Sequence, residues 1–357
     1  MNNSSKILHV ISSLEIGGAQ KLLVDILESI KDNAAVDVLV FKNADSYLSK
    51  RIRTAGIHII NLNKRNTDIS IIRELRKYFK RYDLIHIHLF PALYYAAIAS
   101  MGLNIKLVFT EHSTTNRRRY KQILRPIEKF IYSQYSSVIC VSSQAAASLQ
   151  EWIGLNTCNI LTIENGVNLD YYKAPEIINR KKQIVMVSRF APAKDQETVI
   201  RAMPYVNDDL SLVFAGDGET LDRAKQLVET LHLGQRVFFL GNCTDIRNLL
   251  WDSLIGIQSS KWEGFGLTAV EIMAAGLPII ATDVEGLRQV VADAGIIIPV
   301  GDEKTLAQEI NHLYEDKSFY DMVQSNCIER SKAFSIKKTA ERYLSLYNKL
   351  LDNGPKN

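Results

Sequence analysis

The stretch that decides the fold class is residues 261–283, which read KWEGFGLTAVEIMAAGLPIIATD. Residues 267–275 have the composition of a helix, and Gly276 stands where a left-handed cap ends one. Pro278 then opens an apolar run typical of a buried strand. The stretch therefore predicts a loop, a helix and a strand in the order that builds a parallel sheet.

Outward from this stretch, short apolar runs alternate with longer helical patterns along the whole chain, such as residues 20–30 and 71–78. This alternation predicts an α/β fold with two doubly wound halves, residues 1–170 and 171–339, and 357 residues suit two domains. We expect the linker at residues 171–182, which hold a proline, several charges and no periodic pattern. The expected strands are Ile7–Ile11, Val36–Phe41, His58–Leu62, Leu84–His88, Lys106–Thr110 and Ser137–Val141, then Gln183–Val187, Ser211–Ala215, Val237–Leu240, Leu254–Gln258 and Pro278–Ala281.

The last amphipathic stretch, residues 336–351, is expected to be a helix, and residues from about 340 to 357 are candidates to pack back on the first half. Composition favours a globular protein, with 46% hydrophobic and 23% charged residues. The four cysteines are far apart without metal-ligand spacing, no stretch resembles a secretory signal, and a cytoplasmic location is expected. The uncharged residues 89–105 are marginal for a membrane span and fit a buried helix with a loop better.

Two glycines and two glutamates give residues 261–283 their chemistry. Gly264 and Gly266 let the backbone approach a ligand, and the free amides of the following helix start form an anion site suited to a diphosphate. Glu271 lies one turn into the helix, within reach of ligand hydroxyls, and Glu263 lies on the loop before it. A buried turn with two incidental carboxylates is the alternative, and the combined spacing argues against it.

The two glutamates with seven residues between them, the Gly-Phe-Gly in that interval and the Gly-x-Pro exit resemble the signature of retaining glycosyltransferases of family 4. The resemblance covers nearly the whole chain and implies the GT-B fold, in which two Rossmann-like domains with parallel sheets face each other across a cleft. One departure is Glu285, where many relatives carry a glycine. Further matches to the family pattern are Gly17-Gly18-Ala19-Gln20, Ser188-Arg189 with Lys194, Gly216-Asp217-Gly218 and Asn165-Gly166-Val167.

The resemblance implies a role for each matching residue. Arg189 and Lys194 would bind the diphosphate of a nucleotide-sugar donor, and cations there would neutralise the charge that grows on the leaving group. Glu271 would hold the ribose hydroxyls, and Glu263 would contact the donor sugar and affect turnover. Backbone amides and space for the phosphates would come from Gly264, Phe265, Gly266 and Leu267 and, in the other half, from Gly17 and Gly18.

Histidines at strand ends are the remaining candidates. His112 follows a strand, and the resemblance suggests that it touches the donor sugar or the reacting centre. His86 and His88 share one face of a strand, but no third metal ligand is evident, so a packed strand end is the favoured interpretation. Because the chain has no Asp-x-Asp and carries Arg189 and Lys194 as counter-charges, we expect neither a metal nor another cofactor.

The basic first half suggests an anionic partner, since residues 1–170 carry a net charge of +7 and the remainder carries −3. Apolar residues interleave with the cations of residues 117–129 at helical spacing, as in a helix that lies on an anionic membrane. A solvated helix that packs its apolar stripe on its own domain is the alternative, and nucleic acid is disfavoured. The cations expected at an acceptor or membrane surface are Arg117, Arg118, Arg119, Lys121 and Arg125.

These expectations combine into a retaining, metal-independent glycosyltransferase that moves a sugar, with UDP the expected carrier, to a glycan or lipid-linked saccharide in surface-polysaccharide or glycolipid synthesis. A nucleotide-sugar epimerase or isomerase and a non-catalytic binding subunit are the alternatives. A nicotinamide-dependent dehydrogenase is disfavoured, because the turn at Gly17 and Gly18 lacks Gly-x-Gly-x-x-Gly. The expected location is the cytoplasm, with peripheral contact at the inner face of the cytoplasmic membrane.

Overall fold

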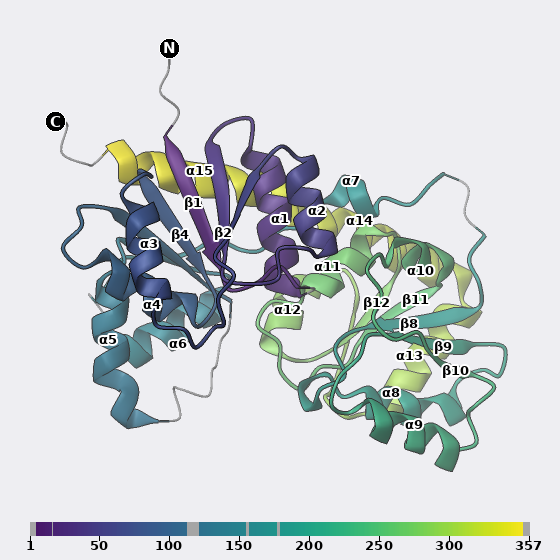
Figure 1. Ribbon diagram of the computed structural model, residues 1–357. Helices are drawn as coiled ribbons and strands as arrows, with labels where there is room; N and C mark the ends of the chain where they lie inside the picture. The colour runs from purple at the N-terminus through teal and green to yellow at the C-terminus, as the bar shows by residue number, and fades with distance from the viewer. Residues whose placement is uncertain (1–4, 16, 113–120, 155–156, 177–178, 353–357) are drawn as a thin grey trace. The chain divides into compact units, whose positions relative to one another are not determined.

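The computed structural model describes residues 5–15, 17–112, 121–154, 157–176 and 179–352. The chain forms two compact units (Figure 1). Unit 1 comprises Met1–Gly166 together with Ile336–Asn357, and unit 2 comprises Val167–Ser335. Each unit holds a parallel sheet with helices and its own hydrophobic core, so both are Rossmann-like α/β units.

Unit 1 contains a seven-stranded parallel sheet in the order β3-β2-β1-β4-β5-β6-β7. The order reverses between β1 and β4, which is where open α/β sheets bind ligands. The helices α3 to α6 pack in a row on one face, and α1 packs against α2 and α15 on the other. The strands are β1 (Lys6–Ile11), β2 (Ala35–Val40), β3 (His58–Asn61), β4 (Leu84–His88), β5 (Lys106–Glu111), β6 (Ser137–Cys140) and β7 (Ile160–Thr162). The helices are α1 (Gly18–Ile30), α2 (Tyr47–Thr54), α3 (Ile71–Phe79), α4 (Ala92–Ser100), α5 (Arg125–Ser133) and α6 (Ser143–Ile153), with a short 3-10 helix η2 (Gln122–Leu124) before α5.

Unit 2 contains a six-stranded parallel sheet in the order β10-β9-β8-β11-β12-β13, which reverses between β8 and β11. The strands are β8 (Gln183–Val187), β9 (Ser211–Ala215), β10 (Val237–Phe239), β11 (Ile255–Gln258), β12 (Ile279–Thr282) and β13 (Ile296–Ile298). The helices are α7 (Leu169–Tyr172), α8 (Gln196–Ala202), α9 (Leu221–Thr230), α10 (Arg247–Asp252), α11 (Leu267–Ala274), α12 (Glu285–Val291), α13 (Glu303–Glu315) and α14 (Lys317–Ser331), with 3-10 turns η3 (Pro192–Lys194), η4 (Met203–Tyr205) and η5 (Lys332–Phe334).

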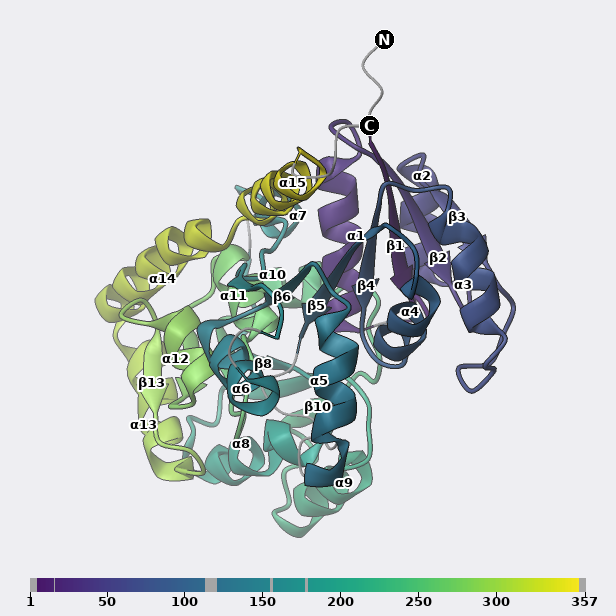
Figure 2. The same ribbon diagram turned by 90° about the vertical axis from the view of Figure 1, so that its left-hand side faces the viewer.

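The C-terminal helix α15 (Ile336–Asp352) belongs to unit 1, although the chain reaches it only after completing unit 2. It lies beside α1 (Figures 1 and 2). Its buried residues Tyr343 and Tyr347 bond to side chains of the central strands, since the Tyr347 hydroxyl lies 2.6 Å from His86 Nδ1 and the Tyr343 hydroxyl lies 3.2 Å from Thr110 Oγ1. Helix α15 therefore covers one face of the unit 1 sheet.

Every strand expected from the sequence is present, with bounds that differ by at most one residue at either end. The edge strands β7 and β13 were missed, because three residues are too short for a periodic pattern to show. Residues 92–100 of the long uncharged stretch form α4, a helix with buried residues in the unit 1 core. Within the described part of the chain, no helix is both long and apolar enough to cross a membrane.

Candidate active site

The candidate site begins at the carboxyl ends of β8 and β11, the neighbouring strands at which the order of the unit 2 sheet reverses. Arg189 and Lys194 lie in the segment after β8, and Glu263 lies in the loop after β11. Two cations and a carboxylate that are far apart in sequence therefore leave the sheet at one edge.

Lys194 and Glu263 form an ion pair in which Lys194 Nζ donates to Glu263 Oε2. The Ser260 hydroxyl donates to the same carboxylate oxygen over 3.3 Å. The two charged side chains are 23% and 18% exposed, so solvent reaches them while the loops on either side hold their backbones. An anion that binds to this cation competes with the carboxylate for its charge.

Hydrogen bonds connect the two loops that carry this pair. The Ser259 hydroxyl donates to the carbonyl oxygens of Lys194 and Asp195 over 2.9 and 3.1 Å. Lys261 lies 3.0 Å from the Asp195 carboxylate, and Thr282 at the end of β12 donates to the Ser260 carbonyl over 2.6 Å. These bonds fix the backbone on both sides of the ion pair, as a preorganised site requires.

Arg189 supplies the second cation, and its side chain is exposed. Among the described residues it has no ion pair. The turn of Gly216 and Gly218 packs closely against the Arg189 loop. A Cβ on Gly216 would lie 2.0 Å from the Ser188 carbonyl oxygen, and one on Gly218 would lie 2.2 Å from the Phe190 carbonyl oxygen. The matching glycine turn thus supports the backbone of the Arg189 loop.

Helix α11 presents an uncapped amino terminus beside Glu263. Gly266 is its N-cap residue in the left-handed region, with φ 90°, and a Cβ there would lie 2.7 Å from Leu287 Cδ2. No side chain caps the helix and its first turn holds no acid, so the first amides, including that of Leu267, remain available to an anion.

The side chains of this loop divide between core and site. The Phe265 ring is buried against Phe334, with centroids 5.6 Å apart, so only its backbone can serve a ligand. Glu271 is 7% exposed and lies in the second turn of α11. Glu285 is the position that departs from the family pattern, and the residue after it, Gly286, packs against the Glu263 loop. A Cβ on Gly286 would lie 2.4 Å from the backbone carbonyl oxygen of Glu263.

In unit 1 the expected residues also gather at the carboxyl edge of the sheet. Gly17 is the N-cap residue of α1, which follows β1 and begins at Gly18. Gly17 has an extended backbone, and the atoms nearest to a Cβ added there belong to the side chain of Gln20. His88 ends β4, and His112 comes directly after β5.

The structure corrects one expectation about the histidines, because a third histidine lies beside His86 and His88. It is His9, which pairs in register with His86 across β1 and β4. All three are buried, and one nitrogen from each lies within 4.8 Å of the others. His9 could not be identified from the sequence as a neighbour of His86, because it is far away in the chain and the parallel pairing of β1 with β4 brings the two residues together.

Hydrogen bonds account for most of these ring nitrogens. His86 lies 2.6 Å from the Tyr347 hydroxyl through Nδ1 and 2.8 Å from Thr110 Oγ1 through Nε2. His9 Nδ1 lies 3.1 Å from His88 Nε2. Burial lowers the pKa of His9 to about 3 and that of His112 to about 4, so the rings are neutral at pH 7.

The basic segment is only partly described. Arg117, Arg118 and Arg119 lie outside the described residues, and Lys121 is exposed. Arg125 is engaged within unit 1, because it donates to the Trp152 and Glu151 carbonyl oxygens over 2.7 and 3.1 Å. Arg125 therefore stabilises the fold of unit 1, although it also lies at the surface.

The apolar residues of this segment point two ways. Ile131 is buried in the unit 1 core, whereas Ile123, Ile127 and Phe130 are 82%, 52% and 51% exposed. They are spaced by four and three residues, so they share one side of η2 and α5. We call Ile123, Ile127 and Phe130 the α5 patch.

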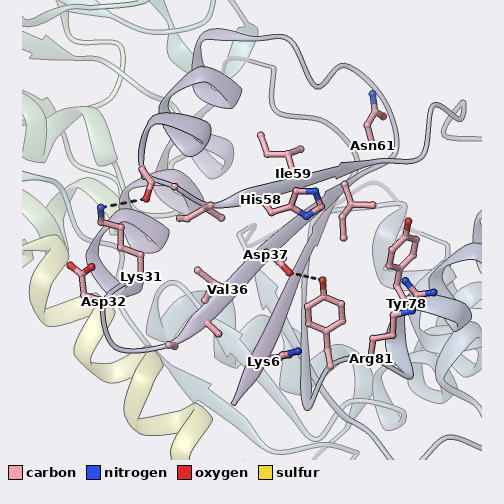
Figure 3. A pocket seen from close by; sticks show the side chains of 17 residues that line it. Lys6, Lys31, Asp32, Val36, Asp37, His58, Ile59, Asn61, Tyr78 and Arg81 are labelled. Carbon is pink, nitrogen blue, oxygen red and sulfur yellow. Dashed lines mark hydrogen bonds between the residues drawn. The ribbon is translucent and has the colours of Figure 1, made fainter. Parts of the chain in front are cut away.

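A cavity of about 840 Å³ lies elsewhere in unit 1, at the amino ends of β1 and β2 and along the edge strand β3 (Figure 3). Its lining includes Lys6, Arg81 and the pair in which the Tyr82 hydroxyl donates to Asp37 over 2.7 Å. Burial and this bond raise the pKa of Tyr82. None of its lining residues was expected at the site, and we assign the cavity no part in the expected chemistry.

Comparison with protein families accounts for both units. A family model described as glycosyl transferases group 1 matches residues 170–333, and one described as glycosyltransferase family 4 matches residues 16–171. The two matches meet near residue 170 and include the Glu263 loop in one and His112 in the other.

Relatives cover most or all of the chain at low identity. N-acetyl-alpha-D-glucosaminyl L-malate synthase of Bacillus anthracis is 28% identical over 75% of each chain. UDP-Gal:alpha-D-GlcNAc-diphosphoundecaprenol alpha-1,3-galactosyltransferase of Escherichia coli is 24% identical over 98% of each chain. The crystal structure of Anabaena HepE in complex with UDP-glucose is similar with a TM-score of 0.85 and 23% identity, over 97% of this chain and all of the other. The structural likeness shows a shared fold.

Proposed function

The chain belongs to the glycosyltransferases of group 1 and family 4, and from this we propose that it transfers a sugar from UDP-sugar to a lipid-linked saccharide. The observation that carries the proposal is the ion pair of Lys194 with Glu263 at the reversal point of the unit 2 sheet, beside the uncapped start of α11 and with Arg189 in the same segment as Lys194. As a glycosyltransferase with the GT-B fold, the protein is a transferase.

The donor binds to unit 2 in this proposal. Its diphosphate lies against the amides at the start of α11, where helices commonly bind anions. Arg189 and Lys194 form ion pairs with the same diphosphate. Glu271, in the second turn of α11, holds the ribose hydroxyls, and Glu263 contacts the sugar. When the diphosphate pairs with Lys194, Glu263 loses its cation and becomes free to accept from a sugar hydroxyl.

The reaction requires no metal ion in this proposal. Breaking the bond between sugar and phosphate leaves negative charge on the nucleoside diphosphate, and fixed cations and helix-start amides stabilise that charge. Arg189 and Lys194 lie in a single segment behind β8, which hydrogen bonds hold in place. The family resemblance supports retention of configuration, with the leaving phosphate on the same face as the incoming acceptor.

The acceptor is proposed to be a lipid-linked saccharide met at the inner face of the cytoplasmic membrane, in the synthesis of a surface polysaccharide. Unit 1 is the proposed acceptor domain and unit 2 is the proposed donor domain. Support comes from the Escherichia coli relative, named as acting on a diphosphoundecaprenol-linked sugar, and from the α5 patch with exposed Lys121 and Lys129 beside it. Sedimentation with anionic vesicles tests the membrane part of this proposal.

The donor and the transfer are tested together. Unfolding temperatures are measured with UDP, GDP, UDP-glucose, UDP-galactose and UDP-N-acetylglucosamine, because a ligand at 100 times its Kd stabilises by about 2.7 kcal/mol. The stabilising sugar nucleotide is then incubated with undecaprenyl-diphosphate-linked sugars, and labelled sugar in the lipid phase is counted. We expect a UDP-sugar to stabilise and transfer. Transfer that stops with EDTA contradicts the metal-free mechanism, and consumption of the nucleotide sugar without transfer favours an epimerase.

A further inference from the structure

A buried hydrogen bond joins His9 and His88 in line with both rings. The ring planes differ by 15°, the nitrogens are 3.1 Å apart and the centroids 5.4 Å apart. The distance between the ring centroids equals the distance between the two nitrogens plus one ring radius on each side. Both nitrogens therefore lie close to the line that joins the two ring centres. One ring therefore donates an N–H straight into the lone pair of the other.

This arrangement differs from that of a metal centre, although the three histidines lie close enough to suggest one. Ligand nitrogens around an ion each direct a lone pair at the ion, about 2.0–2.1 Å away for zinc. Here the lone pair of one ring is directed at the hydrogen of the other. His86 stacks on His88 with centroids 4.3 Å apart, and both of its nitrogens are bonded to hydroxyl groups.

Three ring nitrogens are buried without a hydrogen-bond partner among the described residues: His9 Nε2, His88 Nδ1 and His112 Nε2. An unsatisfied buried polar atom destabilises the fold, so such atoms need an explanation. The rings of His88 and His112 are 6.1 Å apart. At that separation one water molecule or one ligand hydroxyl can bridge two ring nitrogens.

Burial keeps these rings neutral. It lowers the pKa of His9 to about 3 and that of His112 to about 4, and it holds the pKa of His88 well below 6.5. A neutral imidazole has one N–H and one lone pair. Along a bonded chain, the proton position on one ring therefore dictates the proton position on the next.

We infer that His9 and His88 are positioning residues that form a chain with His112 and set which nitrogen of His112 carries its proton. If His9 Nδ1 donates to His88 Nε2, then His88 presents N–H at Nδ1 and His112 offers a lone pair at Nε2. If the chain runs the other way, His112 presents N–H at Nε2. A bridging water or hydroxyl preserves this order when it accepts a hydrogen bond from one ring and donates one to the other, and this is the bridge that the inferred chain requires.

The chain makes a sharp expectation: His9, His88 and His112 share one tautomer, all Nδ1–H or all Nε2–H. Long-range proton–nitrogen NMR spectra of the full-length protein labelled with 15N-histidine report the tautomer of each ring, assigned by single substitutions. Different tautomers on these three rings in the wild type overturn the inference. The measurement needs no substrate.

Variants separate positioning from mere packing. His9→Phe keeps a ring but removes the bond to His88 Nε2, and we expect His112, two rings away, to become a mixture of tautomers. His9→Asn places an amide group near the former Nδ1, and we expect it to restore the single tautomer. His86→Gln is the matched control, a buried neighbour outside the chain, and we expect it to leave the tautomer of His112 unchanged. An unchanged His112 in His9→Phe, checked for an unchanged circular dichroism spectrum, overturns the inference.

The kinetic consequence rests on the proposed function. Substitution of residues that orient metal ligands typically costs 10- to 100-fold in activity, and by analogy we expect His9→Phe to lower kcat about 10-fold with KM for the donor within twofold. His9→Asn should recover most of it. Coupled tautomers in a protein that transfers no sugar contradict the proposed function alone, whereas sugar transfer with uncoupled tautomers contradicts the chain alone.

Addition of cobalt(II) tests whether the histidines form a metal site instead. We expect no visible absorption bands when the ion is added to the wild type. Tetrahedral bands that disappear in His9→Phe overturn the inference, because the ring lone pairs would then be directed at an ion.

Discussion

Lys194 and Glu263 are bonded to each other at the carboxyl edge of the unit 2 sheet, although 69 residues separate them in the chain. One follows β8, the other follows β11, and these two strands are neighbours at the reversal of the strand order. In the proposed function this pair exchanges partners on donor binding, because the diphosphate pairs with Lys194 and a sugar hydroxyl bonds to Glu263. The exchange makes the effects of the two residues separable.

Glu263→Gln should affect turnover rather than donor binding. The amide cannot hold the charge of Lys194, so UDP should bind as tightly as in the wild type or more tightly, while kcat falls at least about 100-fold, the loss typical for one group that stabilises a transition state. Calorimetry with UDP and initial transfer rates measure the two effects. Glu229→Gln, on the exposed side of α9, is the control. Full activity in Glu263→Gln contradicts the assignment.

Lys194→Ala should mainly weaken the donor. The substitution removes a hydrogen bond between charged groups, worth about 1.5–3 kcal/mol, and leaves Glu263 without its cation beside the diphosphate. We expect Kd for UDP to rise roughly 10- to 100-fold by calorimetry. The exposed Lys181, paired with Asp252, provides the control Lys181→Ala. An unchanged Kd for UDP in Lys194→Ala rules out a phosphate contact.

Glu271→Gln should remove discrimination for the ribose. If the carboxylate accepts from the ribose hydroxyls, the wild type binds UDP more tightly than 2′-deoxy-UDP, by roughly 10-fold for a hydrogen bond to a charged group. The variant should bind both nucleotides about equally weakly. The same preference for UDP in wild type and variant contradicts the role, and uridine monophosphate serves as a control that retains the ribose.

The sequence predicted the strands and the Glu263 loop because both are encoded locally. A buried strand such as β8 reads as an almost continuous apolar run, and the Glu263 loop has its own glycines and helix start. The place of His9 beside His86 could not be predicted in this way, because it depends on which strands pair and in what register. The partnership of Tyr347 with His86 spans 261 residues and needs the return of α15 to unit 1.

Acid should destabilise unit 1 through its buried histidines. Their folded pKa values lie below 6.5, at about 3 for His9 and about 4 for His112, so between pH 6.5 and 4 the unfolded chain binds more protons than the folded one. Stability therefore falls as the pH falls, by up to about 1.4 kcal/mol per pH unit for each histidine. Urea unfolding at pH 7, 6 and 5 measures the slope.

The variants provide the test of this slope. His9→Asn should reduce the slope by the contribution of one histidine, whatever it does to stability at pH 7. His58→Gln, on the exposed edge strand β3, should leave the slope unchanged. Stability that stays constant or rises between pH 7 and 5 contradicts neutral buried rings.

Membrane contact through the α5 patch should require both its apolar side chains and its cations. Exposed apolar groups at helical spacing insert at the lipid boundary, and each nearby cation adds about 1 kcal/mol on an anionic surface. We expect the wild type to sediment with vesicles containing phosphatidylglycerol and to remain in solution with phosphatidylcholine alone.

Two multiple variants test the apolar side chains and the cations separately. The double variant Ile127→Ser with Phe130→Ser should abolish sedimentation, and so should the variant with alanine at Arg117, Arg118, Arg119 and Lys121. The control is Phe238→Ser, at an exposed aromatic residue in unit 2. Equal partitioning of the wild type and the two multiple variants rules out this surface, because neither lipid insertion nor charge attraction would then act through it.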